Sequence, residues 1–200
     1  MLISFEGIDG CGKTTQINLL KEKFDFQEIK YISIREPGST PISEQIRDIL
    51  LNPRNTEIAS ETESLLFASA RAQIINEIII PALNEDKIVI CDRFIDSTIA
   101  YQGYGRGMDI KKLENINLFA IQKVIPQFTF YLDISVEESQ LRLSQNGLDR
   151  MESSGYKFFN KVRNGYLQIA KSNNKRVHVI NGLKSREDIF SSILSILELD

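Results

Sequence analysis

Residue types that support several common chemistries are scarce in this sequence. Its 200 residues include two cysteines, one histidine and no tryptophan. Cys11 and Cys91 cannot form the disulfide framework of a small secreted protein, so the cysteine content indicates a reducing compartment. The lone histidine, His178, lies in an apolar stretch and is interpreted as a structural residue. Nucleophilic or metal chemistry based on histidine is therefore not expected.

Long apolar segments and an excess of positive charge are also missing. No apolar run is long enough for a bilayer, and the N-terminus lacks the basic and apolar regions of a signal peptide. The formal net charge of −3 disfavours nucleic acid or an anionic membrane as the main partner. We therefore expect a cytoplasmic protein. Because no linker, repeat or low-complexity segment is present, residues 1–200 are expected to form a single domain.

The clearest motif is a glycine-rich segment near the N-terminus that fits the pattern G-x-x-x-x-G-K-[ST]. It comprises Gly7, Ile8, Asp9, Gly10, Cys11, Gly12, Lys13, Thr14 and Thr15. Glycines allow backbone N–H groups to converge on a polyphosphate, and the dipole of a following helix adds positive charge. Lys13 can then reach the β- and γ-phosphates, and the Thr14 hydroxyl can hold Mg2+. The segment predicts a phosphate-binding loop.

Short apolar strands alternate with helical segments along the chain. Strands are predicted at 2–5, 30–35, 88–91, 128–132 and 177–180. Helices are predicted at 16–24, 42–51, 60–80, 111–124, 135–143, 156–171 and 185–197. Because most strands are apolar on both faces, the pattern indicates an α/β fold with a parallel sheet covered by helices on both sides.

Three segments are interpreted separately. The helix at 60–80 is predicted to end at Pro81, and its stretch 78–80 is apolar all round, so that it fits either a subunit interface or a fully covered core helix. Residues 94–107 are polar and rich in glycine, which favours a loop with a short helix near 97–101. Residues 145–155 are interpreted as a mobile loop.

Functional residues are expected at the carboxyl edge of the sheet, where ligands of such folds bind. The phosphate loop, the loop that starts at Arg35 and the pair Asp92-Arg93 all follow predicted strands. Either Asp92 or Asp133 can supply the carboxylate that organises Mg2+, and Asp92 is preferred because Arg93 adjoins it. Beside a phosphate loop, Arg93 is interpreted as a phosphate clamp.

Several segments together closely resemble the thymidylate kinase family. They are residues 5–15, 35–41, 66–73, 92–94 and 97–107, while residues 148–150 and the aromatic pair at 158–159 are similar to the lid of the family and the helix after it. The resemblance covers nearly the whole chain. It implies a P-loop NTPase fold with three layers, α/β/α, in which helices surround a five-stranded parallel sheet and a mobile lid spans about 145–155.

The resemblance also implies an activity, the transfer of the γ-phosphate of ATP to dTMP, which gives dTDP for dTTP synthesis. The phosphate loop would hold ATP, and Arg142 would cover the adenine. Thr14 and Asp92 would hold Mg2+. Lys13, Asp92, Arg93 and Arg150 would be catalytic. The family further suggests a homodimer.

Acceptor-binding residues are also implied by the resemblance. Asp9 resembles the residue that binds the 3′-hydroxyl of the sugar, and Phe67 the aromatic that stacks on thymine. Arg71 resembles the donor to the O4 atom of the base; Phe67 and Arg71 are four residues apart and share a helix face. Arg93 resembles the clamp on the acceptor phosphate and the transferred group. Tyr101 resembles the residue beneath the sugar, where a 2′-hydroxyl would clash.

Pro37 would form a wall of the thymine pocket, and Ser97 and Gln102 lie where the family reads base and phosphate. The chain also departs from the family pattern. Ser39 stands where the family often has a second glycine. The phosphate loop carries no arginine, so the lid should supply one, and Arg150 is the candidate.

Arg142 is the next candidate for this role, and Asn146 stands where some relatives carry another basic residue.

Other functions remain open. A kinase for a different nucleotide would keep the phosphate loop and differ at Phe67, Arg71 and Tyr101. A GTP-binding switch would need a guanine-reading Asn-Lys-x-Asp segment, and residues 174–177 lack the aspartate. A non-catalytic ATP-binding module is the remaining alternative.

Overall fold

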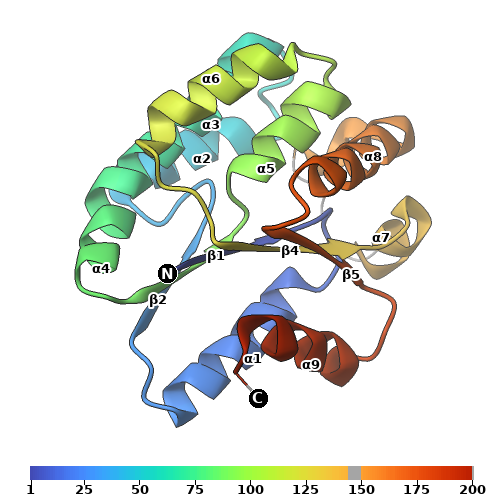
Figure 1. Cartoon of the computed structure of the whole chain (residues 1–200). Coiled ribbons are helices and arrows are strands. Elements are labelled where there is room, and N and C mark those ends of the chain that lie inside the picture. Colours follow the sequence, from blue (N-terminus) through green and yellow to red (C-terminus); the bar gives the residue numbers. More distant parts are fainter. Residues whose placement is uncertain (144–149, 200) are drawn as a thin grey trace.

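The computed structural model describes residues 1–143 and 150–199. It contains one five-stranded parallel sheet between two layers of helices (Figure 1). The strands are β1 (Leu2–Glu6), β2 (Tyr31–Arg35), β3 (Ile88–Asp92), β4 (Phe128–Asp133) and β5 (Val177–Asn181). This confirms the predicted fold class, and each strand lies within a few residues of its predicted position.

The helices follow the predicted pattern closely. They are α1 (Lys13–Phe26), α2 (Pro41–Leu51), α3 (Ser60–Ile74), α4 (Ile80–Asn84), α5 (Ile95–Thr98), α6 (Ile110–Ile121), α7 (Val136–Leu143), α8 (Tyr156–Ser172) and α9 (Arg186–Leu197). Two π-helical segments, η1 (Ile75–Ile79) and η2 (Ile99–Gly105), and a 3-10 turn, η3 (Glu152–Ser154), complete the described elements. Side-chain caps begin several helices: the Thr40 hydroxyl accepts from the Ser43 N–H, and Ser185 caps α9 in the same way.

The strand order β2-β3-β1-β4-β5 places β1 in the centre of the sheet. The helices α1 and α9 cover one face, and α2 to α6 and α8 lie on the opposite side (Figure 1). In the register, Phe5 pairs with Asp92 of β3 and Phe130 of β4. The phosphate loop that follows β1 therefore lies beside the carboxyl ends of both neighbouring strands, as the sequence predicts.

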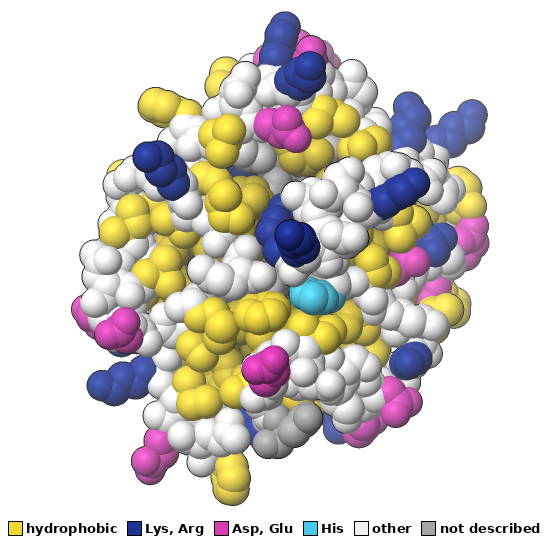
Figure 2. All heavy atoms as spheres, in the orientation of Figure 1, with side chains coloured by type: hydrophobic (Ala, Val, Ile, Leu, Met, Phe, Trp, Pro, Cys, Tyr) yellow, Lys and Arg dark blue, Asp and Glu magenta, His cyan; other side chains and the backbone are white. Residues whose placement is uncertain are grey.

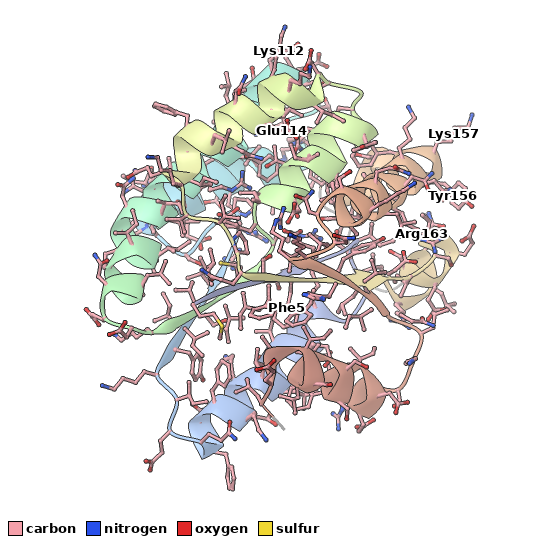
Figure 3. The ribbon with its side chains drawn as sticks, viewed as in Figure 1. Phe5, Lys112, Glu114, Tyr156, Lys157 and Arg163 are labelled. Carbon is pink, nitrogen blue, oxygen red and sulfur yellow. The ribbon has the colours of Figure 1, made fainter. Side chains whose placement is uncertain are left out.

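The sheet is the centre of the apolar core. Phe5 is fully buried and packs against Phe130 with ring centroids 5.3 Å apart. Figure 3 shows Phe5 within the sheet layer, whereas Lys112 and Glu114 project outward from α6. Apolar residues on both sides of each inner strand are buried because helices cover both faces. This rigid centre fixes the positions of the loops at the carboxyl edge.

The predicted end of the long helix at Pro81 is wrong. Helix α3 continues through η1 and α4 to Asn84, and Pro81 lies in the first turn of α4, where its missing N–H is tolerated. In the π-helical turn before Pro81, the hydrogen bonds span five residues instead of four, as in the bond from the Ile80 N–H to the Ile75 carbonyl.

By length and composition alone this helical run, Ser60–Asn84, could cross a membrane. Its residues Ile74, Ile75 and Ile79 are fully buried against the sheet, and Ile78 and Ile80 pack on the same cluster. These contacts favour the core-helix explanation of its all-round apolarity.

Residues 94–107 also differ from their prediction as a mostly irregular loop. They form α5 and η2, and most of η2 is buried. The glycines that suggested a loop instead allow close packing. A Cβ at Gly105 would lie 2.6 Å from the Phe158 ring, and one at Gly103 would lie 3.3 Å from Ile110. Glycine composition alone could not separate these two uses.

The predicted mobile lid lies only partly within the described residues. Residues 145–149, and with them the position of Asn146, lie outside these residues. The remainder, residues 150–155, begins with Arg150 and includes the turn η3.

Candidate active site

The phosphate loop connects β1 to α1 with a backbone that favours glycine. Gly7, Gly10 and Gly12 have φ angles of 139°, 76° and 101°, values that L side chains rarely adopt. A Cβ at Gly7 would also lie 2.7 Å from both the Cys11 sulfur and the Leu132 carbonyl. The helix α1 begins directly after Gly12, so its N-terminal dipole faces the loop. The loop therefore has the geometry of an anion-binding site.

Two side chains of α1 face this loop. The Lys13 ammonium donates to the carbonyls of Gly7 and Ile8 at 3.1 and 3.3 Å, which holds it across the loop. The Thr14 hydroxyl donates to Asp92 Oδ2 at 3.4 Å, and this contact joins the two residues predicted to hold Mg2+. One hydroxyl and one carboxylate suit Mg2+, which takes few protein ligands and completes its shell with water and phosphate oxygens.

The alternative carboxylate, Asp133, is engaged elsewhere. Its two oxygens accept from Arg163 Nε and Nη2 at 2.7 and 2.8 Å, and the Tyr131 hydroxyl also donates to it. Figure 3 shows Arg163 on α8, beside the end of the sheet. Asp133 thus pairs with a neighbouring helix, whereas Asp92 lines the cavity at the phosphate loop.

Arg142 lies against the phosphate loop from the side of α7. Its Nη1 donates to the Gly10 carbonyl at 3.1 Å, its Nη2 to the Gly182 carbonyl at 3.3 Å, and its Nε to Glu138. This places its guanidinium beside Gly10 of the loop. The family resemblance implies that Arg142 covers the adenine of ATP, and this role stays a prediction. The side chains of Ile8 and Cys11, which also belong to the loop, are buried in the core.

Two adjoining cavities open at this edge of the sheet. One contains the phosphate loop, and we call it the donor cavity. The other is called the acceptor cavity. Asp9, Glu36, Arg47 and Arg93 line both. A ligand in one cavity therefore meets a ligand in the other at these four side chains.

The acceptor cavity brings together every residue that the sequence assigns to the acceptor. They are Asp9, Pro37, Phe67, Arg71, Arg93, Ser97, Tyr101 and Gln102. These residues come from the phosphate loop, the loop after β2, the helix α3 and the segment after β3. The cavity thus combines an aromatic ring with several hydrogen-bonding groups, as a nucleotide base and sugar require.

Arg71 is almost fully buried, with 2% of its surface exposed. Its Nε and Nη2 bind Glu36 Oε2 at 2.8 Å, its Nη1 donates to Thr98 and Asn117, and its Nη2 also donates to the Phe94 carbonyl. All three nitrogens therefore have protein partners in this structure. To donate to a base carbonyl, the guanidinium must share or exchange one of these bonds.

Arg93 bridges the two cavities. It adopts a φ of 69°, which is uncommon outside glycine. Its Nη2 binds Asp9 at 2.6 Å, its Nη1 donates to the Gly7 carbonyl, and its guanidinium lies 5.2 Å from the centre of the Tyr101 ring. Burial alone would raise the pKa of Asp9, but Arg93 and Lys13 outweigh it and lower that pKa. Asp9 therefore remains an anion between two cations.

A buried carboxylate, Glu6, supports the turn that carries Arg93. It accepts from the Phe94 N–H at 2.8 Å, from the Ser97 hydroxyl at 2.6 Å and from the Tyr166 hydroxyl at 3.0 Å. Burial, reinforced by the nearby charge of Asp96, raises the pKa of Glu6 to about 7. The Ser97 hydroxyl thus already has two protein partners, Glu6 and the Tyr166 hydroxyl, which lies 2.8 Å away.

Arg150 lies beside the acceptor cavity and outside the donor cavity. Its Nη1 binds Glu63 at 2.7 Å, its Nε donates to the Leu50 carbonyl at 2.6 Å, and 8% of its side chain is exposed. Arg106 binds the same carboxylate. To contact a transferred phosphate, Arg150 would have to leave this buried ion pair. Its catalytic role stays a prediction.

Sequence reasoning missed two residues at the junction of the cavities. Glu36 is 5% exposed, and its Oε1 has no hydrogen-bond partner among the described residues. Arg47 of α2 donates to the Pro37 carbonyl at 2.8 Å. A signal for Arg47 was available, because it is the only basic residue of the helix that follows the Arg35 loop. Glu36 lies in the segment 35–41 that resembles the family, but no pattern in the sequence indicated a role for it.

Comparisons with known proteins identify the family of the chain. A sequence model of the family described as thymidylate kinase matches residues 5–193. The chain is 46% identical to the thymidylate kinase of Chlorobium phaeobacteroides, covering 98% of this chain and 94% of the relative. It is 44% identical to that of a Thermoanaerobacter species, covering 98% and 96%.

The crystal structure of thymidylate kinase from Ehrlichia chaffeensis superimposes with a TM-score of 0.80 at 37% identity, covering 98% of each chain. Sequence and structure comparisons thus agree over nearly the full length. The chain belongs to the thymidylate kinase family.

Proposed function

We propose that this chain transfers the γ-phosphate of ATP to dTMP, giving dTDP and ADP, a step in dTTP synthesis for DNA replication. One observation carries the proposal: the donor and acceptor cavities share a boundary of two arginines and two carboxylates. A phosphate bound in each cavity would place an acceptor oxygen next to a γ-phosphorus. Positioning and charge neutralisation supply most of the catalysis in such transfers.

On the acceptor side, the base enters between Phe67 and the polar residues of α3 and η2. The sugar lies towards Tyr101, with its 3′-hydroxyl donating to Asp9, which is held ionised by Arg93 and Lys13. Arg93 and Arg47 then bind the 5′-phosphate at the boundary of the cavities. This phosphate is the nucleophile, and at neutral pH it needs no general base.

On the donor side, the phosphate loop and Lys13 bind the phosphates of ATP. An oxygen of dTMP forms a bond to the γ-phosphorus while the bond from that phosphorus to the β-bridging oxygen breaks. Lys13 and Arg93 contact the charge that develops on the transferred group. The Lys13 ammonium contacts two loop carbonyls and lies 3.9 Å from Asp9, and the phosphate oxygens would replace the carbonyl contacts.

Thr14 and Asp92 are the residues that would hold Mg2+. When bound, the ion would neutralise charge on the β- and γ-phosphates.

The choice of acceptor tests the proposal. We expect Arg71 to share or exchange one of its protein hydrogen bonds for the O4 atom of the base, so that a pyrimidine with an O4 acceptor is favoured and the amine of cytosine is rejected. An unpaired buried donor costs about 1–3 kcal/mol. We expect dTMP to have the highest kcat/KM, dUMP a lower value and dCMP almost no turnover in a coupled ADP-release assay. Equal turnover of dCMP and dTMP would contradict the assignment, and preference for another monophosphate would favour the rival nucleotide kinase.

Exclusion of ribonucleotides tests the position of Tyr101. Its ring lines the acceptor cavity and packs against Phe158, Phe159 and Tyr166, and we expect it to fill the space that a 2′-hydroxyl would need. We expect Tyr101→Ala to narrow the kcat/KM ratio between dUMP and UMP by about tenfold. Tyr101→Phe keeps the ring and serves as the matched control, with an unchanged ratio. If both variants behave alike, sugar selection resides elsewhere.

The assembly and location are part of the proposal. Apolar side chains are exposed on two helices that pack together: Leu65 of α3, and Leu118 and Phe119 of α6, the last with 88% of its surface exposed. Figure 2 shows exposed apolar side chains over α6. This surface supports a homodimer. A cytoplasmic location fits the two buried free cysteines, and we propose no nucleic-acid or membrane partner.

A further inference from the structure

A buried hydrogen bond fixes one amide of the acceptor cavity. Gln102 of η2 and Glu63 of α3 are each 1% exposed. The Gln102 Nε2 donates to Glu63 Oε1 at 2.9 Å. Because Gln102 also lines the acceptor cavity, the orientation of its amide decides whether the cavity presents a donor or an acceptor.

Glu63 can only accept in this contact. Arg106 binds both of its oxygens, with Nε 3.3 Å from Oε1 and Nη2 3.2 Å from Oε2, and Arg150 Nη1 lies 2.7 Å from Oε2. Burial alone would raise the pKa of Glu63, but the hydrogen bonds from Gln102, Arg106 and Arg150 outweigh burial and hold this pKa below its ordinary value. An ionised carboxylate has no proton to donate. A flipped amide would therefore place its carbonyl oxygen against a carboxylate, which is strongly unfavourable.

The carbonyl oxygen of the Gln102 amide, Oε1, is therefore the atom that can accept a hydrogen bond from a ligand. Among the described residues, no side chain donates a hydrogen bond to Oε1 of Gln102, and Gln102 lines the acceptor cavity. Thymine carries an N–H at N3, next to the O4 acceptor, whereas cytosine has a bare acceptor nitrogen at N3. A fixed acceptor in the cavity thus distinguishes the two bases at an atom that Arg71 does not read.

We propose that Glu63 is a positioning residue for base selection, because it fixes the Gln102 amide with Oε1 towards the N3–H of thymine. The proposal rests on the proposed function, since it assumes that dTMP occupies the acceptor cavity. Glu63 itself does not touch the base. It acts through Gln102, and the two arginines act through Glu63 by keeping it an anion.

The variant Glu63→Gln tests this chain of contacts. Its amide has nearly the shape of the carboxylate but can both donate and accept, so Gln102 is free to flip and to present Nε2 to N3 of cytosine. We expect the ratio of kcat/KM for dTMP over dCMP to fall about tenfold, mostly through the two KM values. A merely structural role would lower both activities together and leave the ratio unchanged.

Two further variants make the test specific. Glu63→Asp keeps an acceptor-only group and is expected to hold the ratio within about threefold of the wild type. Gln102→Leu removes the reading amide, so adding Glu63→Gln to it should change the ratio no further. An unchanged ratio in Glu63→Gln, or an equal fall in the Gln102→Leu background, would overturn the proposal.

Thermal melting identifies the variants that fold. If Glu63→Gln does not fold, Gln102→Leu carries the test alone, and an unchanged ratio in that variant overturns the proposal. Failure of the wild type to phosphorylate dTMP refutes the proposed function itself, whereas dTMP turnover with an unaltered ratio in the variants refutes only the role of Glu63.

Discussion

Replacing Arg93 with methionine is expected to lower kcat about a thousandfold. The arginine contacts the phosphate loop through the Gly7 carbonyl and Asp9, and it also lines the acceptor cavity. Its positive charge neutralises charge on both the acceptor phosphate and the transferred phosphoryl group. Arginines in this role contribute about 10³–10⁵ to the rate of phosphoryl transfer. Because Arg93 also binds the acceptor, kcat/KM for dTMP should fall further than kcat.

Steady-state kinetics with ATP and dTMP measure both values. Arg186→Met is the matched control, because the Arg186 side chain pairs with the exposed Glu187 on the surface of α9, and such pairs contribute little. The control should keep the wild-type kcat. A loss of less than tenfold in Arg93→Met would show that the transferred charge is neutralised by other groups, and Lys13 would then be examined first.

The phosphate loop could be predicted from sequence because its chemistry is local. Gly7, Gly12, Lys13 and Thr14 lie within eight consecutive residues, and each is required by the backbone or the ligand at its own position. The position of Asp92 followed for a related reason, since a parallel sheet aligns the ends of neighbouring strands. Where a rule of spacing or topology determines a position, sequence reasoning succeeded.

Side-chain partners far apart in the chain could not be predicted in this way. Arg71 meets Glu36, Thr98 and Asn117, and nothing in the local pattern states that its guanidinium is surrounded by acceptors. The same limit applies to η2, whose glycines pack against other helices instead of forming a loop. Such features depend on which helices meet, and the helix-helix contacts were not specified by hydrophobic periodicity.

Arg150 is the residue for which sequence and structure lead to different expectations, so its removal is the second decisive experiment. Arg150→Ala leaves Glu63 buried with one arginine instead of two. Breaking a buried ion pair typically costs 3–5 kcal/mol. Since Arg106 still partners the carboxylate, we expect a loss near the low end, about 3 kcal/mol in the free energy of unfolding. Chemical denaturation with and without dTMP measures it.

The kinetic effect of Arg150→Ala separates its two possible roles. Glu63 orients Gln102 in the acceptor cavity, so the structure predicts a KM for dTMP raised about tenfold, with kcat changed less than tenfold. A transition-state arginine would give the opposite result, a kcat lowered by about 10³ at an unchanged KM for dTMP.

Arg142→Ala is the matched comparison for Arg150→Ala. Arg142 is one-third exposed and its ion pair with Glu138 lies at the surface, so stability should change little. Its guanidinium borders the phosphate loop at Gly10, and we therefore expect its loss to raise the KM for ATP and not that for dTMP. If instead kcat collapses in Arg142→Ala while Arg150→Ala only loses stability and dTMP affinity, the arginine that acts on the transferred phosphate comes from α7.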